Sequence, residues 1–232
     1  MPIQERYWHN GQVSGRDAIC LRPDNRAFRY GDGLFETILI RHGKPVGLQL
    51  HVQRLVEGME ILGLDPQLAG FSKDEWHHHL EQVVGKLLIG QDNVGFGRMR
   101  LSVFRAAGGN YLPTQDTPEL LAEVHPLPAD PWILRPPLHV GIAHNFPVMH
   151  SALSAVKSLN ALPYIMAARY AAAQGLDDAI LRSIKGEVVE CASSNIFVVL
   201  QNRIITPWLG SGCLPGTMRA RVMATAQKLG ML

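Results

Sequence analysis

Short apolar strands and amphipathic helices alternate in the first half of the chain. The run "LFETILI" and the later "GLQL" flank polar residues at 42–44, a pattern that predicts a β-hairpin. A helix is expected at about residues 51–62, because apolar side chains recur there at helical spacing. Its predicted buried face consists of Val52, Leu55, Val56, Met59 and Leu62.

A second amphipathic helix is predicted in "SKDEWHHHLEQVVGKLLIG", with Ser72 as its N-terminal cap. Its apolar stripe consists of Trp76, Leu80, Val83, Val84, Leu87 and Leu88. The consecutive residues His77, His78 and His79 would point in different directions around this helix, so they cannot easily bind one ion. We interpret them as a solvated face and expect no metal site.

The segment "GRMRLSVFRAAGG" has the alternation of a strand. One face carries Met99, Leu101 and Val103, and the other carries Arg98, Arg100 and Ser102. Two arginine side chains are therefore expected to project from the same face of a sheet.

The second half predicts a strand near "LHVGIA" and a helix in "LPYIMAARYAAAQG", capped by Asn160 or Ser158 and ended by Gly175. Short strands are expected in "DAILRS", "VVECASS" and "NIFVVLQNRIITP", the last with a turn at residues 201–202. The segment "GCLPGTMRARVMATAQKLG" predicts a loop that leads into a last helix. This order lacks regular strand–helix alternation and indicates an α+β fold.

Between the halves, "VHPLPADPWILRPP" contains five of the 15 prolines, which predicts an extended connector. We therefore expect a domain at 1–123, a linker at 124–137 and a second domain at 138–232.

Composition and charge exclude several classes of protein. The 232 residues are 47% hydrophobic and 18% charged, as in an ordinary globular protein. A net charge of +2 and the lack of a long basic run argue against nucleic acid as a partner. No apolar run approaches the roughly 20 residues of a membrane span, and the start lacks a signal-peptide pattern, so we expect a cytoplasmic protein without membrane contact. The three cysteines, Cys20, Cys191 and Cys213, are interpreted as reduced thiols.

The run "SALSAVKSLN" places one lysine, Lys157, among small and apolar residues. Most lysines simply reach solvent. A lysine that is desolvated close to a helix N-terminus can instead have a lowered pKa, so that its neutral amine can form a Schiff base. The local sequence leaves both interpretations open.

Five segments together resemble the class IV aminotransferase family, the fold-type IV group of pyridoxal phosphate (PLP) enzymes. They are "FRYGDGLFETI", "HVQRL", "AVKSLN", "EVVECASSNIF" and "GCLPGTMR", in the order and at the approximate spacing of that family. The group includes branched-chain aminotransferases, D-amino acid aminotransferases and aminodeoxychorismate lyases. The resemblance implies an α+β, two-domain fold like that of D-amino acid aminotransferase, with a smaller N-terminal α/β domain, a larger C-terminal cofactor-binding domain and the active site between them.

The resemblance also implies roles for individual residues. Lys157 would hold PLP as a Schiff base and move the proton during catalysis, and Glu190 would face the pyridine nitrogen. Arg54 would bind the phosphate, together with the turn at Gly216, Thr217 and Met218 before the last helix. Many members have a hydroxyl where Met218 stands. The polar turn of Ser193, Ser194 and Asn195 would pack near the cofactor.

Candidates for substrate binding are Arg29, Arg98, Arg100 and Phe35. The arginines could pair with a substrate carboxylate or equally form surface ion pairs. The segment "GNYLP" lacks the Arg and His of well-known D-amino acid aminotransferases, and Leu39 stands where branched-chain enzymes have an arginine. Phe35 replaces a tyrosine of some D-specific relatives.

The expected reaction is amino transfer between an amino acid and a 2-oxo acid, by a homodimer with a shared active site. A lyase that forms 4-aminobenzoate and pyruvate is the alternative, because Thr37 matches a threonine that assists elimination in that branch. A second alternative is a PLP-binding protein with little turnover. The family normally continues past the last helix into further strands, so the C-terminal domain is expected to be incomplete in this sequence.

Overall fold

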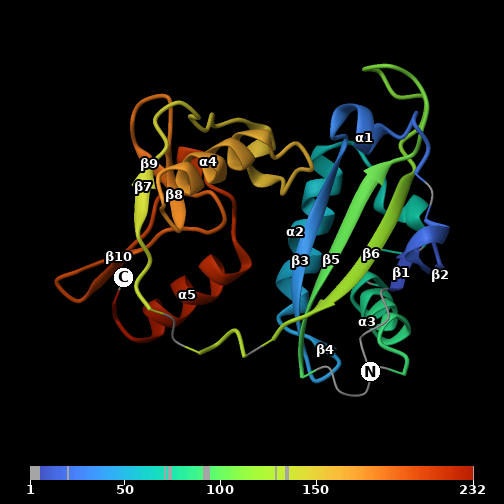
Figure 1. The fold of residues 1–232 in the computed structure, drawn as a ribbon, viewed down its shortest axis with the longest axis horizontal. Coiled ribbons are helices and arrows are strands. Elements are labelled where there is room, and N and C mark those ends of the chain that lie inside the picture. Colours follow the sequence, from blue (N-terminus) through green and yellow to red (C-terminus); the bar gives the residue numbers. More distant parts are fainter. Residues whose placement is uncertain are drawn as a thin grey trace. The chain divides into compact units, whose positions relative to one another are not determined.

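The computed structural model describes residues 6–19, 21–70, 72, 75–90, 95–128, 130–133 and 136–231. Cys20 lies outside these residues. Contacts divide the chain into two units (Figure 1), and each is described by itself. Unit 1 comprises Met1–Leu134 and Lys157–Asn160, and unit 2 comprises Arg135–Val156 and Ala161–Leu232.

Unit 1 is built on a six-stranded antiparallel sheet in the order β2-β1-β6-β5-β3-β4. The strands are β1 (Arg6–His9), β2 (Gln12–Gly15), β3 (Gly33–Arg41), β4 (Lys44–Pro45), β5 (Phe96–Arg105) and β6 (Pro118–Pro126). The alternation predicted for β5 is confirmed, because Met99, Leu101 and Val103 are buried whereas the opposite face is more exposed. β6 extends to Pro126.

The hairpin predicted around residues 42–44 is only partly correct. His42 and Gly43 have φ angles of 46° and 75°, so they form a tight turn of the kind that joins β3 to β4. The segment "GLQL" is not the second strand, because Gly47 adopts a left-handed conformation and starts helix α2 (Leu48–Ile61). The second arm of the hairpin is only Lys44–Pro45.

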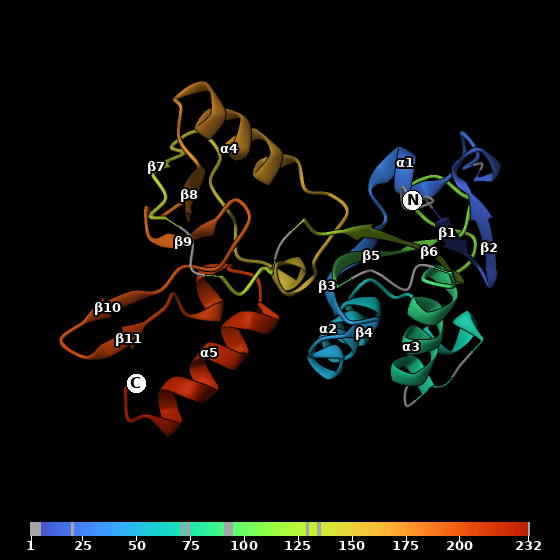
Figure 2. The ribbon, with the colours of Figure 1, turned by 60° about the horizontal axis from the view of Figure 1, so that its bottom comes forward.

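Helices α2 and α3 (Trp76–Leu87) cover one face of this sheet (Figure 2). The buried face of α2 includes His51 and Arg54, whereas the predicted Val52 and Leu62 are only half-buried. The predicted stripe of α3 is buried except for Leu88, which is half-buried.

Ser72 does not cap α3 as predicted. The N-cap residue is Glu75, whose carboxylate accepts a hydrogen bond from the Ser72 backbone N–H at 2.7 Å. His77 and His78 are exposed, and the ring of His79 packs edge-on against Trp8 with 5.3 Å between centroids.

Unit 1 also contains helix α1 (Arg26–Tyr30) and the 3-10 helices η1 (Arg16–Ala18) and η2 (Pro66–Ala69). The Asn25 side chain caps α1 by accepting from the backbone N–H groups of Ala27 and Phe28.

Unit 2 has a three-stranded sheet in the order β7-β8-β9, in which β8 pairs parallel with β7 and antiparallel with β9. Its elements are β7 (Val140–Ile142), η4 (Ala152–Ala155), α4 (Leu162–Ala173), β8 (Asp178–Arg182), β9 (Val188–Cys191), β10 (Val198–Leu200), β11 (Arg203–Ile205), η5 (Leu209–Ser211) and α5 (Thr217–Lys228). Helix α4 packs against β8 over a core of mostly small side chains. The predicted turn between β10 and β11 is confirmed by positive φ angles at Gln201 and Asn202.

The predicted cap of α4 is wrong. Its N-cap residue is Ala161, which forms no side-chain cap. The Ser158 hydroxyl instead accepts a hydrogen bond from the Asn160 N–H at 3.0 Å, because this segment belongs to unit 1 and is shaped by its contacts there.

Within the described ranges, every helix is too short or too polar to cross a membrane. Nor do the described residues contain a group of three or more His, Cys, Asp or Glu side chains suited to a metal ion.

Candidate active site

Lys157 is fixed beside strand β3 by backbone hydrogen bonds. The Phe35 N–H donates to the Lys157 carbonyl at 2.8 Å, and the Leu159 N–H donates to the Gly33 carbonyl at 2.9 Å. Residues 157–160 thus lie along β3 like a short additional strand. The preceding 3-10 helix η4 is held by a capping box between Ser151 and Ser154. Lys157 therefore has a defined backbone position within unit 1.

The Lys157 amine lies over an aromatic ring. Its Nζ is 4.5 Å from the centroid of the Phe35 ring, and the Arg100 guanidinium carbon is 3.9 Å from the same centroid. Both distances are in the range of cation–π contacts. Burial lowers the pKa of Arg100, although the charge of Glu123 opposes this effect. The structure therefore brings together the predicted nucleophile, an aromatic side chain and a candidate carboxylate-binding cation.

The register of the sheet adds two more predicted residues to this face. Thr37 lies opposite Arg100, and Leu39 lies opposite Arg98. Because side chains directly opposite one another in an antiparallel pair share a face, Thr37 and Arg98 lie on the face of Phe35 and Arg100.

Arg29 is placed differently. It is exposed on α1, and its Nε donates to the Pro23 carbonyl at 3.0 Å. Arg29 therefore bonds to a neighbouring carbonyl, whereas Lys157 and Arg100 contact the Phe35 ring.

Arg54 lies in a buried ion pair that the sequence analysis did not anticipate. Its Nε and one terminal nitrogen donate to the two oxygens of Glu36 at 2.8 and 2.6 Å. His51 Nδ1 lies 2.7 Å from the same carboxylate. Burial alone would raise the pKa of Glu36, but the hydrogen bonds from His51 and Arg54 and their charges lower it overall. Glu36 thus fixes the orientation of the predicted phosphate-binding arginine.

A signal for Glu36 was present in the sequence. In "GLFETILI" it alternates with Phe35 and Thr37 and shares a face with Leu34 and Ile38, which are almost fully buried. A carboxylate at a core-facing position requires a cationic partner, and the following helix offers one in "HVQR".

Glu190 is the buried acid of unit 2. It lies on β9 and is 4% exposed. Its Oε1 accepts from the Tyr164 hydroxyl at 2.8 Å, and its Oε2 accepts from the Leu214 N–H at 3.1 Å and from the Asn195 amide at 3.4 Å. Tyr164 lies in the first turn of α4 and was not predicted as a site residue from the sequence.

The turn before α5 packs closely against Asn195. A Cβ on Gly216 would lie 1.9 Å from Asn195 Oδ1, so no other residue fits there without a shift. Gly216 is the N-cap of α5, Thr217 is its first residue and Met218 is exposed. The first backbone N–H groups of a helix have no acceptor within it and can bind an anion.

Ser193 and Ser194 are exposed in the turn that follows β9. The Ser193 hydroxyl donates to Asp178 at 2.7 Å, and the Ser194 carbonyl accepts from the Cys191 N–H. In the structure both residues shape this turn, which places Asn195 next to Glu190.

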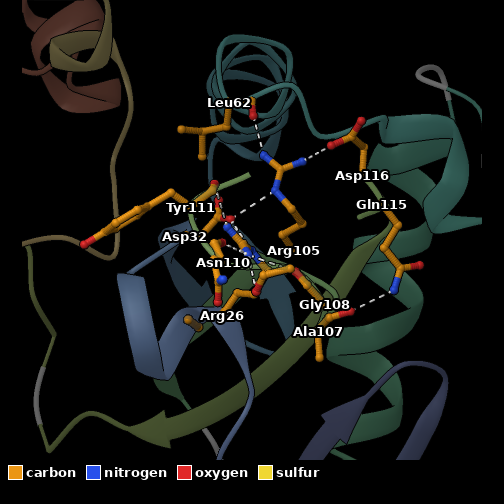
Figure 3. Close-up of polar contacts among 12 residues, drawn as sticks. Arg26, Asp32, Leu62, Arg105, Ala107, Gly108, Asn110, Tyr111, Gln115 and Asp116 are labelled. Atoms are coloured by element: carbon orange, nitrogen blue, oxygen red, sulfur yellow. Dashed lines mark hydrogen bonds and ion pairs between the residues drawn. The ribbon is translucent and has the colours of Figure 1, made fainter. Parts of the chain in front are cut away.

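A second cluster of ion pairs, built on the buried side chains of Arg26 and Arg105, holds the loop between β5 and β6 (Figure 3). Arg26 and Arg105 both donate to Asp32, at 2.7 and 3.0 Å. Arg26 also donates to the carbonyls of Gly108 and Asn110, and Arg105 donates to Asp116 and the Leu62 carbonyl. This cluster was not predicted from the sequence.

Each unit, taken by itself, contains groups of the kinds that PLP requires. Unit 1 has the Lys157 amine, and unit 2 has the buried Glu190 carboxylate and the first N–H groups of α5. The close approach of Gly216 to Asn195 forms the backbone turn from which that helix begins.

Comparison with known proteins gives consistent results. The family described as amino-transferase class IV matches residues 33–232. A probable branched-chain-amino-acid aminotransferase of Rickettsia bellii is 25% identical over 231 residues, which cover 97% of this chain and 75% of that protein. A D-alanine aminotransferase of Bacillus licheniformis is 26% identical over 222 residues, covering 96% of this chain and 75% of the relative.

A solved structure of 4-amino-4-deoxychorismate lyase from Pseudomonas aeruginosa has a TM-score of 0.78 and 27% identity, covering 97% of this chain and 78% of the other. The relatives thus differ in their named reactions but share one fold and one family. This chain belongs to the class IV aminotransferase family of PLP-dependent enzymes.

Proposed function

We propose that this protein transfers an amino group between an amino acid and a 2-oxo acid. The observation that carries this proposal is the contact of the Lys157 amine and the Arg100 guanidinium with one Phe35 ring. An amine that can act as nucleophile and base lies close to a cation that can bind a substrate carboxylate. When PLP is bound, it withdraws electrons from the Cα of the attached amino acid.

Each residue has a distinct part in this proposal. Lys157 Nζ holds the cofactor, takes the proton from the substrate Cα and delivers it to the cofactor's C4′. Glu190 keeps the ring nitrogen protonated through its negative charge. Arg54, oriented by Glu36, and the first turn of α5 bind the phosphate. Arg100, with Arg98 on the same face, binds the substrate carboxylate.

The visible spectrum of the reconstituted protein tests the proposal. D- and L-amino acids are added separately, without an oxo acid, and conversion of PLP to its amine form is followed. Conversion by one enantiomer of the amino acid is expected for the wild type and for the control variant Lys185→Ala, which changes an exposed lysine. Lys157→Ala is expected to lose the conversion by a factor of about 10³ or more, since it removes both nucleophile and base. Full conversion by Lys157→Ala would refute the assignment.

The lyase reaction is the second candidate, because Thr37 lies directly opposite Arg100 on the same face. A hydroxyl there can assist the departure of a leaving group. Faster release of pyruvate and 4-aminobenzoate from the chorismate-derived substrate than of oxo acids from any amino acid would favour this reaction. Cofactor binding without either reaction would indicate a PLP-binding protein with little turnover.

We further propose that the protein works as a cytoplasmic homodimer with a shared active site. Its family resemblance supports the dimer, and the free buried thiols of Cys191 and Cys213 are compatible with a reducing compartment. Sedimentation equilibrium at micromolar concentration and cell fractionation test these two statements.

A further inference from the structure

The hydrogen bonds around Glu190 differ between its two oxygens. Oε2 accepts from a backbone N–H and from the Asn195 amide, whereas Oε1 accepts from the Tyr164 hydroxyl. Each of these donors is uncharged, and the carboxylate is almost fully buried. A buried carboxylate depends on such bonds to remain ionised, because burial favours its neutral form.

Tyr164 is well placed for this purpose. It lies in the first turn of α4, packs against the core of unit 2 and reaches Glu190 at 2.8 Å. Burial raises the pKa of Tyr164, and the negative charge of Glu190 raises it further, so the hydroxyl keeps its proton and acts as donor.

We propose that Tyr164 is a positioning residue for Glu190. Its hydroxyl keeps the Glu190 carboxylate ionised and oriented toward the ring nitrogen of PLP. This inference rests on the proposed function of Glu190.

Two groups near Glu190 are neutral below about pH 8. They are the thiols of Cys191 on β9 and Cys213 in the turn before α5. Burial raises the pKa of both thiols; the charge of Glu190 adds to this effect in each, and Asp178 on β8 does so for Cys191. Asp178 is bonded to Ser193, whereas the Tyr164 hydroxyl is bonded to Glu190, so a change in acidic pH dependence after removal of that hydroxyl is assigned to Glu190.

The first test uses the protein without cofactor. Alkaline titration of its five tyrosines by ultraviolet absorbance should reveal one that ionises later than the others. Tyr164→Phe should remove this late step, and Tyr170→Phe, on the same helix, should leave it. In Glu190→Gln the late step should move to lower pH, because the neighbouring charge is gone. A late step that persists in Tyr164→Phe would overturn the inference.

The second test measures the half-reaction with an amino acid as a function of pH, after unfolding temperatures have confirmed that the variants fold. Without the hydroxyl, the pKa of Glu190 should rise. The acidic limb of the rate-against-pH profile should therefore shift to higher pH by about one unit in Tyr164→Phe. Tyr170→Phe should match the wild type. An unmoved limb in Tyr164→Phe overturns the inference while the proposed function stands. A Glu190→Gln variant that reacts like the wild type overturns the proposed role of Glu190 itself.

Discussion

At the scale of single residues, the buried carboxylate of Glu36 is the most consequential. It is 1% exposed and forms an ion pair with Arg54, so Glu36→Gln removes the carboxylate charge that faces this buried arginine in unit 1. We expect a loss of about 3 kcal/mol in the free energy of unfolding at pH 7, measured by urea titration. The control Glu57→Gln, on the exposed side of the helix that carries Arg54, should change this free energy by less than about 0.5 kcal/mol.

The pH dependence of this difference has a defined sign. The fold lowers the pKa of Glu36, so its contribution is present above the unfolded-state pKa of about 4.3 and is lost as the pH falls through the lowered native value. The difference in free energy of unfolding between the wild type and Glu36→Gln should therefore be constant near neutral pH and should become smaller below about pH 4. A difference in free energy of unfolding that grows as the pH falls would contradict the ionised state assigned to Glu36.

At the scale of elements, the loop between β5 and β6 is held by Arg26. This buried side chain donates to carbonyls of Gly108 and Asn110, next to Tyr111, whose side chain is 91% exposed. Replacing the guanidinium in Arg26→Met should allow the loop to open locally, and cleavage by chymotrypsin after Tyr111 should accelerate about tenfold. Arg22→Met, which removes an exposed ion pair nearby, should leave the cleavage rate unchanged. Equal rates in both variants would show that Arg26 does not anchor the loop.

At the scale of the whole molecule, the two units have cores of different size. Unit 1 buries large side chains such as Trp8, Trp76 and Phe104, whereas four of the eight buried residues in the unit 2 core are alanines. Unit 2 should therefore unfold at a lower urea concentration. In a Trp208→Phe variant, whose remaining tryptophans all lie in unit 1, circular dichroism, which reports both units, should begin to change before the tryptophan fluorescence. Leu181→Ala should lower the free energy of unfolding of unit 2 by about 3 kcal/mol and so move only the early transition to lower urea concentration. Coincident transitions for both probes would contradict this prediction.

Much of the local structure could be predicted from the sequence. The stripe of α3 and the alternation of β5 follow from periodicities that each element carries in its own residues. The turns at His42 and Gln201 likewise follow from residue types that tolerate positive φ angles. The order of five motifs was sufficient to identify the family and its cofactor.

The errors lie where distant segments decide the local structure. Helix α2 begins at Leu48 and not at His51, and α4 is capped at Ala161 and not at Asn160 or Ser158. In the second case, the backbone before the helix is bonded to β3, more than 100 residues earlier in the chain. A cap rule that considers only neighbouring residues cannot include such a constraint.

The sequence by itself determined which chemical groups are available: one lysine among small residues, an acid in a short predicted strand, and a glycine turn before a helix. Only the tertiary structure decided their partners. It placed Lys157 over Phe35, Arg54 against Glu36 and Tyr164 on Glu190. The physical reason is that periodicity fixes the face on which a side chain lies, whereas hydrogen bonds and ion pairs between buried groups depend on packing between elements that are far apart in the chain.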